Sequence, residues 1–174
     1  MATTWFFETF ILRAEQPGYR PFHPAFEELF NSYYNAVGRQ HARSMRALLS
    51  RPDVAEIGRY RAHVDNAMMA LITGCDQACL ARVAPLVELG INHEQQHQEL
   101  LLTDLKHAFS FNPLAPALRS GREPSGLAPR AAKYIEYGAG KVEIGADGNE
   151  FCFDNETPRH HVWLPNAFAL ADRP

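Results

Sequence analysis

This sequence of 174 residues lacks the features typical of membrane and secreted proteins. No stretch approaches the roughly 20 apolar residues that a membrane-spanning helix needs. An apolar cluster occupies the first twelve residues, but no basic segment precedes it and no small-residue cleavage site follows it, so it does not resemble a signal peptide. The sequence therefore predicts a protein that works in water.

The sequence also has little net charge and few cysteines. Seventeen basic and twenty acidic side chains leave a net charge of −3, which provides no broad positive surface for nucleic acid or anionic lipid. Cys75, Cys79 and Cys152 are too few and too unevenly placed for a disulfide framework, and none belongs to a CxxC pair. We therefore expect a cytoplasmic protein with neither nucleic-acid nor membrane partners.

The first two thirds of the sequence is expected to be helical, because its apolar residues recur at helical spacing. Helices are predicted over residues 3–12, 24–37, 53–73 and 76–109. Asp76 can cap the last of these, and Pro85 is expected to kink it or to delay its regular start. Successive amphipathic helices with short connections indicate a helix bundle. The first helix lacks a capping residue, so we expect the beginning of the bundle to be missing.

The character of the sequence changes after residue 111. Residues 112–130 contain four prolines, two glycines and two serines, a composition typical of a linker. Short strands are predicted at 141–144, 161–164 and 168–170. We therefore predict a bundle over 1–111, a linker over 112–132 and the start of a second domain over 133–174, which is too short for an independent core.

The fourth predicted helix carries the clearest chemical signal, the run HEQQH from His93 to His97. Residues four apart lie one above the other on a helix, so both imidazoles can face one metal ion. The same face continues with other polar side chains, and buried polar groups need partners. His107 is interpreted as a helix C-terminal residue, and His63 as a histidine bonded to a backbone carbonyl, rather than as ligands.

Two other interpretations of HEQQH stay open. A histidine pair at this spacing can simply form a solvated helix face. The run also matches the HExxH pattern of zinc hydrolases, in which Glu94 would act as general base, but no third ligand follows at the spacing of those enzymes. The sequence alone therefore favours a metal site without fixing its chemistry.

Five separated segments resemble one known family, the non-haem iron sulfoxide synthases of ergothioneine biosynthesis. The segments are TTWFFETF from Thr3, YRPF from Tyr19, LLSRP from Leu48, HEQQHQELLLTDLKHAFSFNP from His93, and FDNETP from Phe153. The resemblance implies a DinB-like four-helix bundle followed by an α+β domain like that of formylglycine-generating enzyme, with a C-type-lectin-like core. It covers nearly the whole chain.

The resemblance also implies an activity. Enzymes of this family use Fe(II), held by three histidines, and O₂ to join the thiol of γ-glutamylcysteine or cysteine to the imidazole of hercynine. By resemblance, His93 and His97 are two iron ligands, and Gln96 lies near the substrate imidazole. Arg43 and Arg46 resemble the basic residues that hold the carboxylates of the thiol substrate, which suits the forked donors of guanidinium; a solvated basic loop is the alternative.

One position departs from the family. The third histidine ligand belongs three residues before the Trp5–Phe6 pair, and this position is Ala2. The later part of the second domain, which carries the remaining catalytic residues of the family, has no counterpart here. We therefore expect the chain to be a fragment of such an oxidoreductase that is inactive alone, or else a non-catalytic metal-binding or interaction module from a decayed gene.

Overall fold

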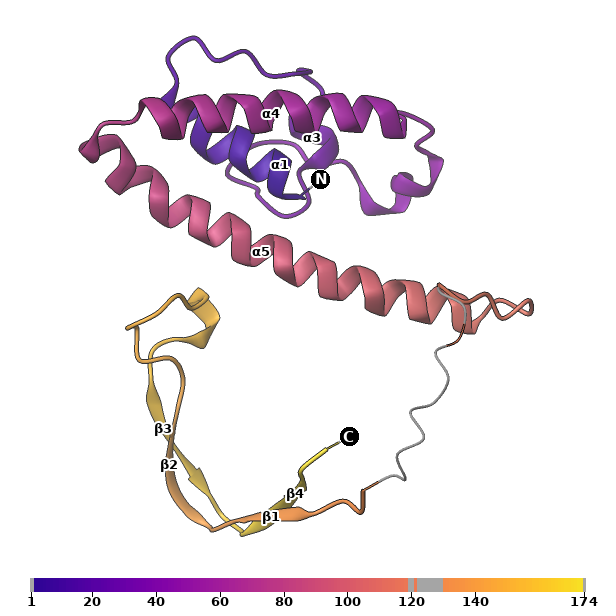
Figure 1. Ribbon diagram of the computed structural model, residues 1–174, viewed down its shortest axis with the longest axis vertical. Coiled ribbons are helices and arrows are strands. Elements are labelled where there is room, and N and C mark those ends of the chain that lie inside the picture. The colour runs from indigo at the N-terminus through magenta and orange to yellow at the C-terminus, as the bar shows by residue number, and fades with distance from the viewer. Residues whose placement is uncertain (1, 119–120, 122–129, 174) are drawn as a thin grey trace. The chain divides into compact units, whose positions relative to one another are not determined.

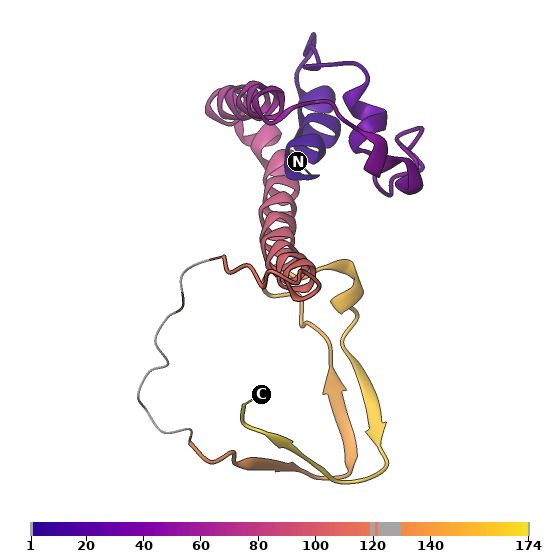
Figure 2. The ribbon, with the colours of Figure 1, turned by 90° about the vertical axis from the view of Figure 1, so that its right-hand side faces the viewer.

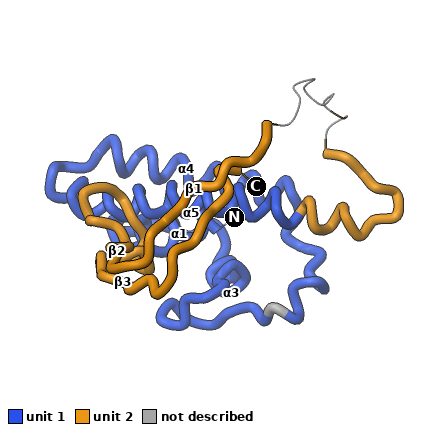
Figure 3. Tube along the Cα trace, turned by 90° about the horizontal axis from the view of Figure 1, so that it is seen from below, with its two compact units in different colours: residues 1–104 blue, residues 105–174 orange. Residues whose placement is uncertain are grey.

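The computed structural model describes residues 2–118, 121 and 130–173, without the side chain of Arg43. The chain folds into two compact units, residues 1–104 and 105–174, and the division falls inside the last long helix (Figure 3). The first unit is helical and the second contains all the described strands. The expected order, helices first and strands afterwards, is confirmed.

The N-terminal helical stretch covers residues 2–15 in three consecutive segments: α1 (Ala2–Phe7), the π-helical turn η1 (Glu8–Leu12) and α2 (Arg13–Glu15). The predicted helix over 3–12 is confirmed and continues for three residues. Ile11 and Leu12 are fully buried, as is the carboxylate-bearing Glu8.

Two long helices follow, α4 (Val54–Gly74) and α5 (Gln77–Ser110), and the first unit contains all of α4 and α5 as far as Asp104 (Figure 1). The Asp53 carboxylate caps α4 by accepting a hydrogen bond from the Glu56 backbone N–H at 2.7 Å. The predicted cap of α5 is confirmed, because Asp76 accepts from the Cys79 N–H at 2.7 Å. None of the described helices is both long and apolar enough to span a membrane.

Pro85 lies inside α5 and does not delay its start, contrary to one of the two expected outcomes. The proline removes one helical hydrogen bond, the one that Ala81 would accept. Ala81 is exposed, so water can satisfy the carbonyl that is left over.

The predicted helix over 24–37 is wrong beyond residue 30. Only α3 (Phe26–Phe30) forms, and Asn31 follows with an extended backbone. The fully buried Asn31 side chain accepts from the Tyr34 N–H and donates to the Tyr34 carbonyl, both at 2.9 Å, and it also reaches the Gly38 carbonyl at 3.4 Å. Asparagine bonds of this kind favour turns over helix. The loop continues to the 3₁₀ segment η2 (Arg43–Leu48).

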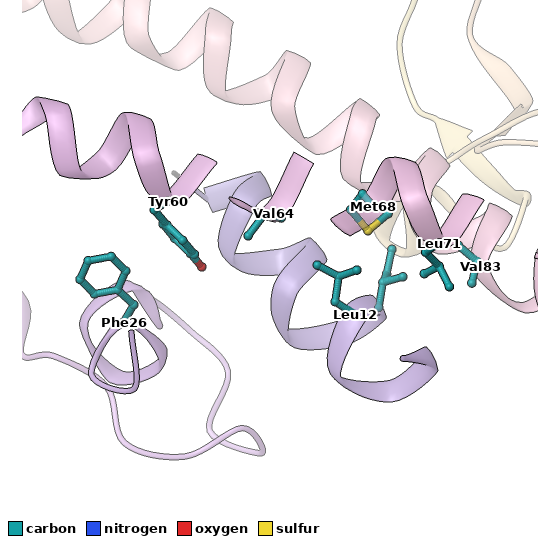
Figure 4. Close-up of a cluster of buried hydrophobic side chains, with 8 residues drawn as sticks. Leu12, Phe26, Tyr60, Val64, Met68, Leu71 and Val83 are labelled. Carbon is teal, nitrogen blue, oxygen red and sulfur yellow. The ribbon is translucent and has the colours of Figure 1, made fainter. Parts of the chain in front are cut away.

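A cluster of buried apolar side chains lies between these helices (Figure 4). Its buried members are Ile11, Leu12, Phe26, Tyr60, Val64, Met68, Leu71 and Val83. Each fully buried aliphatic or aromatic side chain contributes about 1.5–3 kcal/mol relative to exposure. The cluster therefore joins the N-terminal helical stretch, α3 and α4 to the first turns of α5.

Glu8 lies in this core with three hydrogen-bond donors. The hydroxyls of Tyr60 and Tyr19 donate to its carboxylate at 2.7 and 2.8 Å, and the Phe22 N–H donates at 3.2 Å. Burial, followed by the bond to Glu8, raises the pKa of both tyrosines well above the usual range. This network, which was not predicted from the sequence, ties η1 to α4 and to the loop before α3.

The second unit consists of two antiparallel strand pairs, and Figure 2 shows them as narrow ribbons. β1 (Tyr134–Tyr137) pairs with β4 (Phe168–Ala171), and β2 (Gly140–Ile144) pairs with β3 (His160–Leu164). β1 was not predicted. None of the described residues from 105 to 173 is buried.

Candidate metal centre

Helix α5 holds His93 and His97 one turn apart. Their ring centroids are 4.6 Å apart and the ring planes are nearly perpendicular, at 87°. The spacing follows from helix geometry alone, because side chains at i and i+4 share a face.

Both imidazoles line a small cavity of about 60 Å³ within the first unit. The other lining residues come from α1, α3 and the loop after α3: Ala2, Trp5, Phe6, Phe30, Ser32, Tyr33 and Tyr34. His93 is half-buried and His97 is exposed. This volume is enough for an ion and a little water, since a cavity needs about 10–15 Å³ to hold one water molecule.

Helix α1 contacts α5 beside the histidine pair, through its first turn and through its last residue. The Thr3 hydroxyl donates a hydrogen bond to the Glu94 carboxylate, joining residues 91 apart in sequence. One turn earlier on α5, the buried Gly90 faces the Phe7 ring so closely that an added Cβ would overlap it. A glycine inside a helical pattern signals close approach, but the sequence alone does not identify the partner.

The pKa of His93 is lowered, first by burial and then by the neighbouring His97 imidazole, although Glu94 opposes the shift. The neutral imidazole is the form that binds a metal ion. The lowered pKa therefore favours the neutral form of His93.

A second cavity, of about 320 Å³, adjoins the first and shares Ala2, Phe30 and Ser32 with it. Arg46 and Arg51 line it, and Arg46 donates to the Ser32 hydroxyl at 3.3 Å. Neither guanidinium forms an ion pair with a carboxylate in the described part of the chain.

Arg51 was not among the predicted site residues, although it belongs to the LLSRP segment. The side chain of Arg43 lies outside the described part of the structure. Of the two predicted arginines, Arg46 therefore lines the second cavity.

The other histidines and Gln96 lie elsewhere. Gln96 is exposed and is not among the residues that line the histidine cavity. His63 is within 3.1 Å of the Arg20 carbonyl through Nε2, which confirms the predicted backbone bond. His107 is in the last turn of α5 and packs edge-on against Phe111, with 4.8 Å between ring centroids.

The cavity brings together two imidazoles that can act as metal ligands, those of His93 and His97. Among residues 2–118, 121 and 130–173, no group of three or more histidine, cysteine, aspartate or glutamate side chains is placed to hold an ion. The two imidazoles suit Fe(II), Zn(II) and similar ions. Ala2, at the same cavity, has no donor atom in its side chain.

Comparisons of the sequence with protein-family models and with curated proteins find no match.

Proposed function

We propose that this chain carries two of the three iron-binding histidines, His93 and His97, of an Fe(II)- and O₂-dependent sulfoxide synthase. The reaction would join the thiol of γ-glutamylcysteine or cysteine to the imidazole ring of hercynine, as in the ergothioneine-pathway enzymes that the sequence resembles. Ala2 takes the position of the third ligand, so this chain alone is not expected to turn over.

One observation carries the proposal. Ala2 and the two histidines line the same cavity, although 91 residues separate Ala2 from His93. The resemblance assigns the third ligand to the position of Ala2 from sequence alone. The position that the resemblance assigns to the third ligand therefore lies at the same cavity as the two histidines. This agreement supports a residue-by-residue correspondence with the family.

The arginine cavity supports the substrate part of the proposal. Arg46 and Arg51 can each donate a pair of hydrogen bonds to a carboxylate, and a small thiol such as cysteine or γ-glutamylcysteine carries one or two. The arginine cavity and the histidine cavity share walls at Ala2, Phe30 and Ser32, which supports a thiol site beside the imidazoles. A bound Fe(II) ion would supply the redox chemistry, and the side chains would orient the thiol beside it.

Anaerobic Fe(II) titration of the full chain tests the metal part. The His93→Ala and His97→Ala variants should each bind iron at least about tenfold more weakly, because even the loss of an outer-shell partner costs that much. His107→Ala, on the same helix, is the matched control and should bind as the parent does. Equal iron uptake by all four proteins would contradict the proposal.

Thiol binding tests the substrate part separately. In the iron-loaded chain, γ-glutamylcysteine or cysteine should perturb the iron absorption spectrum. Arg46→Ala should weaken this thiol effect without changing the affinity for Fe(II). If iron binds at the histidine pair but neither thiol nor hercynine affects it, a metal-binding module explains the chain better than a synthase.

A further inference from the structure

The corner between α4 and α5 contains a pair of bonded cysteines. Cys75 directly follows the last residue of α4, and Cys79 is in the first turn of α5. Their Cα atoms are 5.4 Å apart and their sulfur atoms form a disulfide. This pair was not predicted, because four-residue spacing across a helix corner is not a recognised disulfide pattern in the sequence.

Small molecules can reach the pair from one side. Both cysteines are half-buried and pack against the apolar cluster. A cavity of about 460 Å³ opens onto them, and its walls include the charged side chains of Glu15, Asp76 and Arg82. A polar cavity of this size admits a low-molecular-weight thiol, whereas a bond sealed inside an apolar core would be inert.

The corner does not depend on the sulfur–sulfur bond. The Asp76 side chain accepts from the Cys79 N–H at 2.7 Å, and its carbonyl accepts from the Leu80 N–H at 2.9 Å. Arg82 forms a two-pronged ion pair with Glu15 of α2, at 2.7 and 3.2 Å. These contacts hold the start of α5 in place, so the cysteines stay within bonding reach when they are reduced.

We propose that Cys75 and Cys79 form a reversible dithiol–disulfide site that exchanges with small thiols and their disulfides. In the oxidising direction, one cysteine thiolate attacks a small disulfide RSSR, forms a mixed disulfide and releases RSH. The second cysteine then attacks the mixed disulfide, which closes the Cys75–Cys79 bond and releases a second RSH. The protein loses two electrons and two protons, and RSSR is reduced to two thiols.

The site is independent of the histidine pair and of any activity there. Cys79 is near the start of α5, the helix that carries the histidines, and Cys75 follows the end of α4, so oxidation adds a covalent tie between the two helices. Cys152, in the second unit, is a free thiol, and it provides an internal control.

Equilibration of the full chain in mixtures of reduced and oxidised glutathione tests the proposal. After each equilibration, free thiols are alkylated and peptides are mapped by mass spectrometry without reduction. Cys75 and Cys79 should lose their alkylation together, at one midpoint, and a peptide cross-linked between them should appear. Excess dithiothreitol should restore both thiols while the circular dichroism of the helices is unchanged.

Two variants sharpen the test. Cys152→Ser should leave the midpoint unchanged, whereas Cys75→Ser should abolish the cross-link and leave Cys79 with a glutathione adduct. The proposal is overturned if Cys75 and Cys79 stay alkylatable in every mixture, or if each ends as a separate glutathione adduct. It is also overturned if the bond resists dithiothreitol in the folded protein. These outcomes are read from the parent chain, so they stand even if a variant does not fold.

Discussion

Replacement of Tyr60 by phenylalanine tests how the buried carboxylate holds the first unit together. The change removes only the hydroxyl that donates to Glu8 at 2.7 Å, and the ring keeps its packing against Phe26 at 5.1 Å between centroids. Glu8 keeps two donors, from Tyr19 and Phe22, but loses one. A hydrogen bond to a carboxylate contributes about 1.5–3 kcal/mol, so we expect the free energy of unfolding to fall by about 2 kcal/mol.

Urea unfolding at pH 7 measures this loss. Trp5 is buried in the first unit, so its fluorescence reports the unfolding of that unit. With a slope of about 1.5–2 kcal/mol per M, the midpoint should fall by about 1 M without a change of slope. Tyr134→Phe, at a tyrosine that is 70% exposed, is the control. If Tyr60→Phe shifts the midpoint no more than this control does, the Glu8 network does not stabilise the unit.

Three further predictions follow from the same contacts. Gly90→Ala should lower the unfolding midpoint and weaken Fe(II) binding, because the new methyl group overlaps the Phe7 ring. Gly58→Ala, in open space on α4, should instead stabilise the chain by up to about 1 kcal/mol. Equal unfolding midpoints for the two variants would contradict the close approach of Gly90 to Phe7. Ala2→His should tighten Fe(II) binding at least about tenfold in the same titration, and no tightening would argue that position 2 is not at the ligand site. Because burial and Glu8 raise the pKa of both Tyr60 and Tyr19 in the folded state, the unfolded state loses these protons first as pH rises, and stability should fall above about pH 10 by about 1.4 kcal/mol per pH unit for each tyrosine. In urea titrations from pH 9 to 11, Tyr60→Phe should have a shallower slope than the parent, because only the contribution of Tyr19 is left.

The parts of the fold that depend on local pattern could be predicted from the sequence. The Asp76 cap and the helix that ends at Gly74 follow from residue preferences within one or two turns. The helix predicted to reach residue 37 failed, because Asn31 bonds to the backbone of residues up to eight positions later, and apolar periodicity does not register such bonds. The Glu8 network was missed for the same reason, since its partners lie 11 to 52 residues away.

The candidate site likewise has a part that could be predicted from local sequence and a part that could not. The contact between His93 and His97 is a consequence of four-residue spacing on one helix, so it could be predicted from the sequence. The contribution of α1, through Ala2 and the Thr3 bond to Glu94, depends on how two distant helices pack. From the sequence, Glu94 was considered only as the general base of a hydrolase, and its bond to Thr3 was not predicted. Arg51 was not predicted to line the arginine cavity, because its position depends on the conformation of the loop before α4.

X-ray absorption at the iron edge of the anaerobically Fe(II)-loaded chain tests the central claim most directly, because it counts the imidazoles bound to the ion. Our account predicts a signal from two imidazoles in the parent chain and from one in His93→Ala or His97→Ala, with His107→Ala unchanged. An iron environment of oxygen ligands alone, identical in all four proteins, would contradict it.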